Sequence, residues 1–271
     1  MTDHELSISS FRDLSPLYTA YTMEDDEDGN PIYMYSSFGF FTTEYAAYFG
    51  KSSSKPSTLT IEELKACLKP LPDDDVYPEL PMSGITIFSG LVDDPKLFLK
   101  APKVHEDFIG TGLLPKLMLQ EAETLELLLR TPHPNIARYH GCLAKRGRIV
   151  RLVFDRYDMT LKQRLDREEI SRHLNIDNLM KQIESALHHL HILGLAHNDL
   201  NPMNIMINDS NETLYLIDFG SCRPFGASLI TGGTPGWFDE DYSISAKEND
   251  EIALEKLRSW LYTMKEQQSL E

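Results

Sequence analysis

Positive charge, cysteine and long apolar runs are all scarce in this sequence. Its 26 Lys and Arg residues stand against 42 Asp and Glu residues, which leaves a formal net charge of −16. We therefore expect no nucleic-acid partner and no membrane partner, because both anionic surfaces select for clustered basic side chains. Three widely separated cysteines cannot form a disulfide framework.

No apolar run approaches the roughly 18 residues that a transmembrane helix needs. The opening MTDHELSISSFRDL has early acids and no apolar core, so we expect no signal peptide. A cytoplasmic or nuclear location is the corresponding expectation.

In other respects the composition is that of an ordinary globular chain of 271 residues, 41% hydrophobic and 25% charged. Its texture changes near residue 76. Before that point, Tyr- and Phe-rich runs flank the acidic turn of YTMEDDEDGNPIYMYSSFGFF, which predicts a β-hairpin. A short helix with a capping box is predicted after Ser57. No chemistry attaches to these elements, so we treat 1–75 as an N-terminal extension of unknown role.

Short strands come first and helices later in the rest of the chain. The predicted strands are 85–92 and 96–102, which would form a hairpin, then 136–143 and 148–154, and a late hairpin of 204–208 with 214–218. The predicted helices are 113–130, 160–168, 176–193 and 249–264. This order indicates an α+β fold with two lobes.

Three polar residues stand at informative positions in LAHNDLNPMNIMINDSNETLYLIDFG. Asn204 and Asp218 flank the late hairpin, so folding that hairpin should bring them together. An amide oxygen and a carboxylate are hard donors, of the kind that Mg²⁺ takes along with phosphate oxygens. Asp199 would face the same cleft as a separate carboxylate.

HNDLNPMN followed by IDFG resembles the catalytic loop and the metal-binding loop of eukaryotic-type protein kinases. Other segments match the family in the same order: LFLK, LQEAETL, LVFDRYDMTL, SALHHLHILG, GTPGW and END-EIAL. The resemblance implies a bilobal fold, with a small antiparallel-sheet lobe at 76–157 and a mainly helical, shortened lobe at 158–271.

The resemblance also implies roles and cofactors, namely ATP and Mg²⁺. Asp199 would accept or orient the proton of a substrate hydroxyl, and Asn204 and Asp218 would hold Mg²⁺. Lys100, which ends LFLK, would contact the α- and β-phosphates of ATP.

Further family positions concern the nucleotide. An acid of the helix 113–130 would orient the lysine, and we favour Glu121 over Glu123 because Glu121 shares a face with the apolar side chains. Backbone groups from Asp155 to Tyr157 would meet the adenine edge, and Met206 would lie under the ring.

Two residues resemble structural members of the catalytic region. His197 would pack near Phe219. Asp250 shares a helix face with Leu257 and Leu261, so it should point inward, where the family uses such an acid to anchor the backbone of the catalytic loop.

The sequence departs from the family pattern in several places. No G-x-G-x-x-G precedes Lys100, so backbone amides cannot cover the phosphates in the usual way. Phe98 stands where the family prefers a small residue, and its ring would narrow the nucleotide pocket. Asn198 replaces the arginine that pairs with a phosphorylated activation segment. Asn201, which we count as a catalytic candidate, replaces a charge-stabilising lysine.

The resulting hypothesis is an ATP- and Mg²⁺-dependent phosphotransferase that resembles a serine/threonine protein kinase. A small-molecule kinase of the aminoglycoside-phosphotransferase type is an alternative, with a metabolite hydroxyl as acceptor in place of a protein. A catalytically inactive pseudokinase scaffold is the other, favoured by the missing glycine-rich loop and by Phe98. The oligomeric state stays open.

Overall fold

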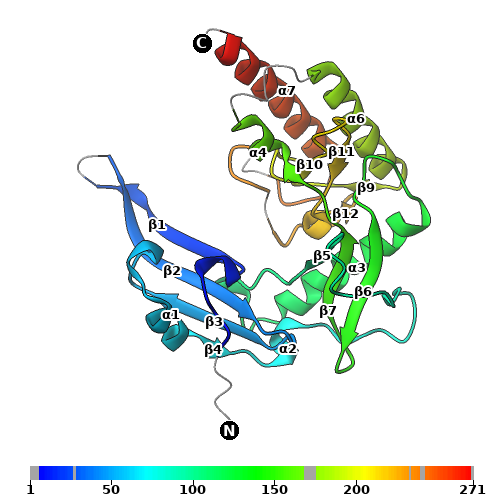
Figure 1. Ribbon diagram of the computed structural model, residues 1–271. Helices are drawn as coiled ribbons and strands as arrows, with labels where there is room; N and C mark the ends of the chain where they lie inside the picture. Colours follow the sequence, from blue (N-terminus) through cyan, green and yellow to red (C-terminus); the bar gives the residue numbers. More distant parts are fainter. Residues whose placement is uncertain (1–5, 27–28, 168–174, 232, 239–241, 270–271) are drawn as a thin grey trace. The chain divides into compact units, whose positions relative to one another are not determined.

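The computed structural model describes residues 6–26, 29–167, 175–231, 233–238 and 242–269 (Figure 1). Its contacts divide the chain into two compact units. The first consists of Met1–Ser83, Lys100–Leu119 and Cys142–Leu152, and the second of Gly84–Leu99, Gln120–Gly141 and Val153–Glu271. The segments 1–75, 76–157 and 158–271 stay a prediction as domain boundaries.

A four-stranded antiparallel sheet organises the first unit. Its strands follow one another in space as in the chain: β1 (Leu17–Asp25), β2 (Pro31–Phe41), β3 (Ala47–Ser52) and β4 (Lys69–Pro70). The short helices of this unit are η1 (Phe11–Asp13), η2 (Pro56–Thr58), α1 (Ile61–Cys67), α2 (Asp73–Val76) and η3 (Glu106–Phe108). The hairpin predicted in the N-terminal extension is confirmed as β1 and β2, although Glu27 and Asp28 of its acidic turn lie outside the described residues.

Helix α1 covers one face of this sheet (Figure 1). Phe38 and Phe40 of β2 point to that face because they alternate along the strand, and they form a buried core with Leu64 and Leu68. The predicted capping box is present at Thr60, whose hydroxyl accepts from the Glu63 backbone N–H at 3.2 Å. The extension therefore has a core of its own.

A second hairpin binds the acidic run of residues 73–75. Its two-residue turn, Arg146 and Gly147, has φ of 51° and 73°, which suits the twist of the flanking strands. The Arg146 guanidinium donates to the Asp73 carboxylate at 2.6 Å and to the Glu44 carbonyl at 2.8 Å. Arg148 pairs with Asp74. These bonds join the extension to the rest of the first unit.

One three-stranded sheet and one helix belong partly to each unit. The strands are β5 (Leu97–Lys100), β7 (Arg148–Asp155) and β6 (Tyr139–Lys145), in that spatial order, and the helix is α3 (Leu113–Arg130). The predictions of a helix at 113–130 and of strands near 136–143 and 148–154 are confirmed.

The prediction of a strand at 85–92 is wrong: these residues, all of which are described, contain no strand. The Thr86 backbone N–H and hydroxyl donate to the Glu126 carboxylate instead, at 2.7 and 2.9 Å. Gly141 of β6 lies so close that a side chain there would meet the Thr86 carbonyl at 2.7 Å. A side-chain anchor thus takes the place of a strand ladder, which the alternating pattern of the segment does not reveal.

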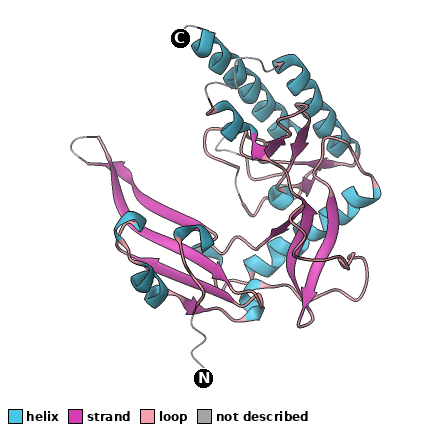
Figure 2. Cartoon of the chain, in the orientation of Figure 1, coloured by secondary structure: helices cyan, strands magenta, loops and turns pink. Residues whose placement is uncertain are grey.

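Helices dominate the later part of the chain (Figure 2). They are α4 (Leu161–Leu165), α6 (Ile176–Ile192) and α7 (Lys247–Ser269), with a short 3₁₀ turn, η4 (Phe219–Ser221). Small antiparallel pairings connect them: β10 (Ile205–Ile207) between β11 (Leu214–Leu216) and β8 (Met159–Thr160), and β12 (Arg223–Pro224) with β9 (Leu195–Ala196). Strands first and helices later confirm the α+β class.

Helices α6 and α7 lie side by side in the second unit (Figure 1). Each buries an apolar stripe, with Leu179 and Leu190 on α6 and Leu257 and Leu261 on α7. Arg258 of α7 forms an ion pair with a glutamate of α6 at 2.5 Å. No helix in the described part of the chain combines the length and the apolar character that crossing a bilayer requires.

Candidate active site

The loop between β9 and β10 holds Asp199 in a dense set of hydrogen bonds. Its Oδ1 accepts from the Thr234 backbone N–H and hydroxyl, each at 2.8 Å, and from Asn201 Nδ2 at 3.0 Å. Its Oδ2 accepts from Asn204 Nδ2 at 2.8 Å. Because all these donors are uncharged and come from two different segments, the half-buried carboxylate is held in one orientation without an ion pair in the described residues.

Asn201 is engaged entirely within this network. Its Oδ1 accepts from the backbone N–H groups of Met203 and Asn204, at 2.9 and 3.2 Å, and its Nδ2 also donates to the Thr234 hydroxyl at 3.0 Å. Only 1% of its surface is exposed. The amide therefore shapes the loop around Asp199, and its candidate role is one of positioning.

Asn204 and Asp218 come together as the hairpin spacing predicts. The Asn204 carbonyl accepts from the Ile217 backbone N–H at 2.9 Å, next to Asp218. The Nδ2 of Asn204 faces Asp199, so its Oδ1 is the atom left to coordinate a cation. Asp218 has a left-handed backbone, with φ of 62°, and its Oδ1 accepts from the Gly220 N–H at 3.4 Å. Such a conformation is uncommon for residues other than glycine, and the non-glycine residues that adopt it cluster at functional sites.

The donor set of Asn204 and Asp218 fits magnesium. One amide oxygen and one carboxylate give two hard oxygen ligands, and Mg²⁺ usually takes few protein ligands beside phosphate and water oxygens. The hydrogen bond from Asn204 Nδ2 to Asp199 fixes the orientation of the Asn204 amide. Metal ligands commonly have such a supporting hydrogen bond.

Glu121 lies beside this site, whereas Glu123 does not. Glu121 is buried and Glu123 is exposed on the opposite side of α3. A methyl group placed on Gly220 would lie 3.3 Å from Asp218 Oδ1 and 3.8 Å from Glu121 Oε2, so the two carboxylates flank the same point. This supports Glu121 over its neighbour. Lys100 ends β5 within the first unit, and its role stays a prediction.

The residues expected around adenine belong to a different part of the second unit. The Asp155 backbone N–H donates to the Arg138 carbonyl at 3.0 Å, and the Arg156 N–H to the Lys96 carbonyl at 2.7 Å. With those two donors engaged, Tyr157 is the position at which an adenine-binding N–H is best sought. The adenine role of the stretch from Asp155 to Tyr157 stays a prediction.

Two further nucleotide candidates lie on strands. Met206 is half-buried on β10, opposite Thr160 and Tyr215. Phe98 lies on β5 with 48% of its surface exposed, which leaves its ring free to border a ligand. The nucleotide roles of Met206 and Phe98 also stay predictions.

Asp250 anchors the loop, as its helix face predicts. It is fully buried, and its carboxylate accepts from the backbone N–H groups of His197 at 2.9 Å and Asn198 at 2.8 Å. His191 Nε2 lies 2.9 Å from its Oδ2. His197 packs edge-on against Phe219, with ring centroids 5.5 Å apart, which confirms the predicted neighbour.

Asn198 has a larger structural role than the sequence indicated. Its side-chain Nδ2 donates to the carbonyls of Ala196 and Ser221, both at 2.9 Å, and to the Ser245 hydroxyl at 3.0 Å. Its Oδ1 accepts from Asn249 Nδ2 at 3.0 Å. The residue has φ of 61°, a conformation that asparagine tolerates better than most residues. Asn198, which stands where the family has an arginine, therefore joins four segments through uncharged hydrogen bonds.

In the sequence, Thr234 matches the family pattern only as part of GTPGW. In the structure it supplies two of the four hydrogen bonds to the Asp199 carboxylate. The available signal was its position after a glycine and before a proline, which predicts a turn but says nothing about what the turn approaches.

Arg223 fixes the helix that carries Glu121. Its guanidinium, largely buried, donates to the side-chain oxygen of Gln120 on α3. Burial lowers the pKa of Arg223 from its ordinary value, while the nearby acids act in the opposite direction. The bond ties α3 to the segment that follows Asp218.

Two relatives of known description cover part of the chain. The chain is 28% identical over 182 residues to the serine/threonine-protein kinase/endoribonuclease IRE1 of Hypocrea jecorina (strain QM6a), which covers 61% of this chain and 14% of that protein. It is 34% identical over 137 residues to cyclin-dependent kinase 4 of Mus musculus, covering 48% of this chain and 45% of the relative. The chain thus spans less than half the length of each of these relatives.

A crystal structure of the yeast RNA polymerase II CTD kinase CTDK-1 complex superposes with a TM-score of 0.49 at 21% identity, over 62% of this chain and 55% of the other. The protein kinase domain family matches residues 102–237, a stretch that runs from just after Lys100 through the Asp199 loop and Asp218 to Thr234. The chain belongs to the protein kinase family.

Proposed function

We propose that the chain transfers the γ-phosphate of ATP to a hydroxyl group, as a serine/threonine protein kinase does, with Asp199 as the catalytic base. The observation that carries the proposal is the orientation of the Asp199 carboxylate by Thr234, Asn201 and Asn204, directly beside the proposed metal pair. The relatives described as kinases give the same reaction class.

Asp199 acts on the proton of the acceptor. As the hydroxyl oxygen bonds to the γ-phosphorus, its proton passes to the Asp199 carboxylate and ADP leaves. General base catalysis of this kind contributes typically about 10²–10⁴ in rate. Most of the remaining acceleration in phosphoryl transfer comes from positioning and charge stabilisation. The several neutral hydrogen bonds that fix the Asp199 carboxylate are consistent with this need for positioning.

Asn204 and Asp218 would hold Mg²⁺, which neutralises charge on the phosphate oxygens when bound. The phosphate contact of Lys100, its orientation by Glu121, and the adenine contacts of Asp155, Tyr157, Met206 and Phe98 belong to the same proposal on the strength of the family resemblance. Each of these residues keeps the role that its motif implies.

Asn201 sets an upper limit to the expected rate. A lysine at this position would place a positive charge near the transferring phosphate, whereas the buried amide of Asn201 offers only neutral donors. Removal of one such charge stabiliser typically costs about 10²–10³. We therefore expect slow turnover compared with a kinase that has the lysine.

Thr234 favours a protein acceptor over a metabolite. Its backbone N–H and hydroxyl contact the Asp199 carboxylate directly, so a chain that pairs with the segment around Thr234 would present its hydroxyl close to Asp199. Transfer of labelled phosphate to mixed peptides on one hand and to a pool of metabolites on the other separates the two acceptor classes. Label found only on small molecules would establish the alternative, a small-molecule kinase.

Thermal unfolding with Mg·ATP tests the nucleotide part of the proposal. Wild-type protein should be stabilised and Asp218→Asn should lose most of the shift. Asp199→Asn should keep most of it, because the side-chain oxygen that remains can still accept from Asn204 and because Asp199 contacts the acceptor rather than the nucleotide. A wild-type protein that shows no shift would contradict the proposal.

A pseudokinase scaffold is the second candidate, and one observation favours it. Residues 84–92 contain no strand and include only Gly84 and Gly90, so this segment offers no glycine-rich loop to cover phosphates. If the chain is such a scaffold, Mg·ATP should leave the unfolding temperature unchanged in both the wild type and Asp218→Asn. Phosphotransfer requires a shift in the wild type.

A further inference from the structure

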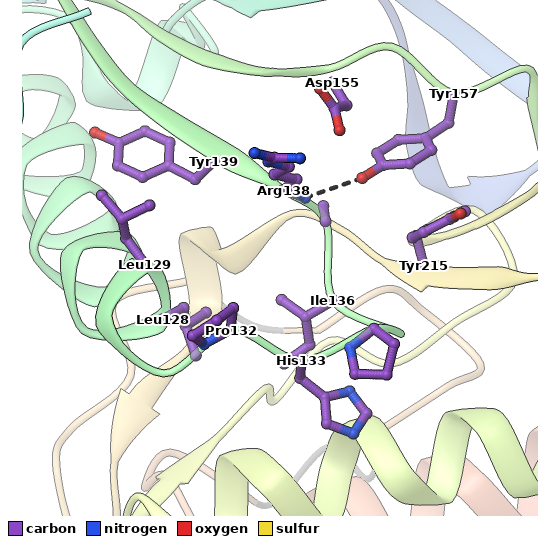
Figure 3. A pocket seen from close by; sticks show the side chains of 12 residues that line it. Leu128, Leu129, Pro132, His133, Ile136, Arg138, Tyr139, Asp155, Tyr157 and Tyr215 are labelled. Atoms are coloured by element: carbon purple, nitrogen blue, oxygen red, sulfur yellow. Dashed lines mark hydrogen bonds between the residues drawn. The ribbon is translucent and has the colours of Figure 1, made fainter.

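The second unit contains a cavity of about 520 Å³ to which the phosphotransfer proposal assigns no ligand (Figure 3). From Asp155 to Tyr157 that proposal assigns only backbone groups to adenine, whereas the side chains of Asp155 and Tyr157 line the cavity. It lies between the C-terminal end of α3, the segment 132–139, and the side chains of Asp155, Tyr157 and Tyr215. Asp199, Asn204 and Asp218 are absent from its described lining. Its volume falls within the range of about 300–1,000 Å³ that is usual for small-molecule sites.

Two tyrosines form an aromatic wall on one side of the cavity. The rings of Tyr157 and Tyr215 stack with centroids 4.2 Å apart and planes 28° apart. The Tyr157 hydroxyl accepts from the Arg138 backbone N–H at 2.9 Å, so it keeps its own proton for donation (Figure 3). Burial raises the pKa of Tyr157 to about 12, and the hydroxyl is therefore a donor at neutral pH.

Apolar side chains form the opposite wall. Leu128 and Leu129 project from the last turn of α3, and Pro132 and Ile136 continue the surface (Figure 3). Leu129 is 37% exposed, a large apolar side chain left partly in water at the end of a helix. An aromatic body inserted here would remove apolar surface from water on both sides.

The charged groups of the cavity differ in how they are paired. The Asp155 carboxylate lies 2.7 Å from His140 Nε2. Arg138 is exposed, and among the residues that the structure describes its guanidinium takes part in no ion pair. In a chain with a net charge of −16, such a guanidinium above an apolar cavity is a place for an anion, since it offers planar, charge-assisted donors.

We propose that this cavity binds a small aromatic carboxylate or a similar organic anion. The ring packs between the leucines of α3 and the stacked tyrosines, and the anionic group contacts the Arg138 guanidinium and the Tyr157 hydroxyl. The proposed ligand contacts the side chains of Arg138 and Tyr157, whereas adenine is assigned to backbone groups of 155–157, so the test needs no nucleotide and no acceptor.

The test uses two fluorescent probes with the same ring system, 1-anilinonaphthalene-8-sulfonate and its uncharged analogue N-phenyl-1-naphthylamine. Arg138→Gln removes the charge at an exposed position and should weaken the sulfonate about tenfold while changing the neutral probe less than about twofold, as loss of one charge-assisted contact implies. The matched control is Arg130→Gln, at an exposed arginine that ends α3 outside the cavity lining, and it should change neither probe.

A second variant tests the apolar wall. Leu129→Asn should weaken both probes several-fold, and Ile192→Asn, at an exposed isoleucine outside the cavity lining, should weaken neither. Added 3-phenylpropionate should displace the sulfonate probe from the wild type. The proposal is overturned if Arg138→Gln and Arg130→Gln act alike on the sulfonate probe, if Leu129→Asn leaves both probes unchanged, or if phenylpropionate does not compete.

Discussion

Replacement of Asn198 by alanine should loosen the segment that follows Asp218 and lower the stability of the whole chain. The asparagine amide donates to the carbonyls of Ala196 and Ser221 and to the Ser245 hydroxyl, and it accepts from Asn249. Alanine keeps none of these bonds and leaves four polar groups to find other partners inside a region where Asn198 itself is 2% exposed.

The magnitude follows from the bonds and from the backbone. Two amide hydrogens and one accepted bond correspond to about three hydrogen bonds, each worth roughly 0.5–1.5 kcal/mol net. Alanine at φ of 61° adds a cost of about 1 kcal/mol that asparagine largely avoids. The free energy of unfolding should therefore fall by about 4 kcal/mol, which for a chain of this size lowers Tm by roughly 8–16 °C.

Thermal unfolding measures the size of the effect, and hydrogen exchange followed by mass spectrometry locates it. The N–H groups of Gly226 and Leu229 donate to the carbonyls of Ser245 and Ser243, both at 2.8 Å. In Asn198→Ala these amides should exchange faster, because one end of the ladder loses its attachment. The β10–β11 hairpin should keep its protection.

Asn178→Ala is the control, since Asn178 is exposed on α6 and its side chain can be removed without loss of a buried contact. Its Tm should stay within about 1 °C of the wild type. Two results would refute the assignment of Asn198 as the junction. One is a decrease in the Tm of Asn198→Ala of less than about 2 °C, and the other is a large decrease without faster exchange at 226–229.

Three other changes have definite expected results. Arg146→Gln should lower the free energy of unfolding in urea by roughly 1 kcal/mol, because it breaks an exposed but bidentate pair with Asp73. Gly220→Ala should reduce the Mg·ATP thermal shift, since the new methyl group would lie 3.3 Å from Asp218 Oδ1 and displace the carboxylate. His133 makes stability depend on pH: burial, aided by the neighbouring histidine, lowers its pKa on folding, so the unfolded chain binds more protons and stability falls as the pH drops below about 6.5.

Each of these three predictions can be refuted by a specific outcome. Lys145→Gln, on the same hairpin as Arg146 and exposed, should leave urea stability unchanged, and an equal loss in both variants would remove the ion pair as the cause. An unaltered Mg·ATP shift in Gly220→Ala would speak against Asp218 as a ligand. His133→Gln should flatten the decline of Tm between about pH 7.5 and 5.5, and an unchanged slope would assign the dependence to other groups.

Sequence patterns within a segment predict those secondary-structure elements that depend mainly on interactions within the segment. The helix at 113–130 and the hairpin of β1 and β2 carry their own signals, an apolar stripe and an acidic turn between aromatic runs. The inward position of Asp250 followed from helix periodicity, and the approach of Asn204 to Asp218 followed from hairpin closure.

Contacts between distant segments could not be predicted in this way. The segment at 85–92 has an alternating pattern, yet it forms no strand, and bonds from Thr86 to Glu126, 40 residues away, hold it. From the sequence, Asn198 is only the replacement of an arginine. Its junction role is not visible there, because its four hydrogen-bond partners are brought together only by the fold. Thr234 likewise reaches Asp199 across 35 positions of sequence.

Transfer of labelled γ-phosphate from Mg·ATP to an acceptor hydroxyl, compared in single turnover between wild type and Asp199→Asn, tests the assignment of this chain as a phosphotransferase most directly. We predict measurable transfer by the wild type and a loss of about 10²–10⁴ in the variant, with nucleotide binding retained. Equal rates in the two proteins, or no transfer by the wild type to any peptide or metabolite, would contradict the assignment.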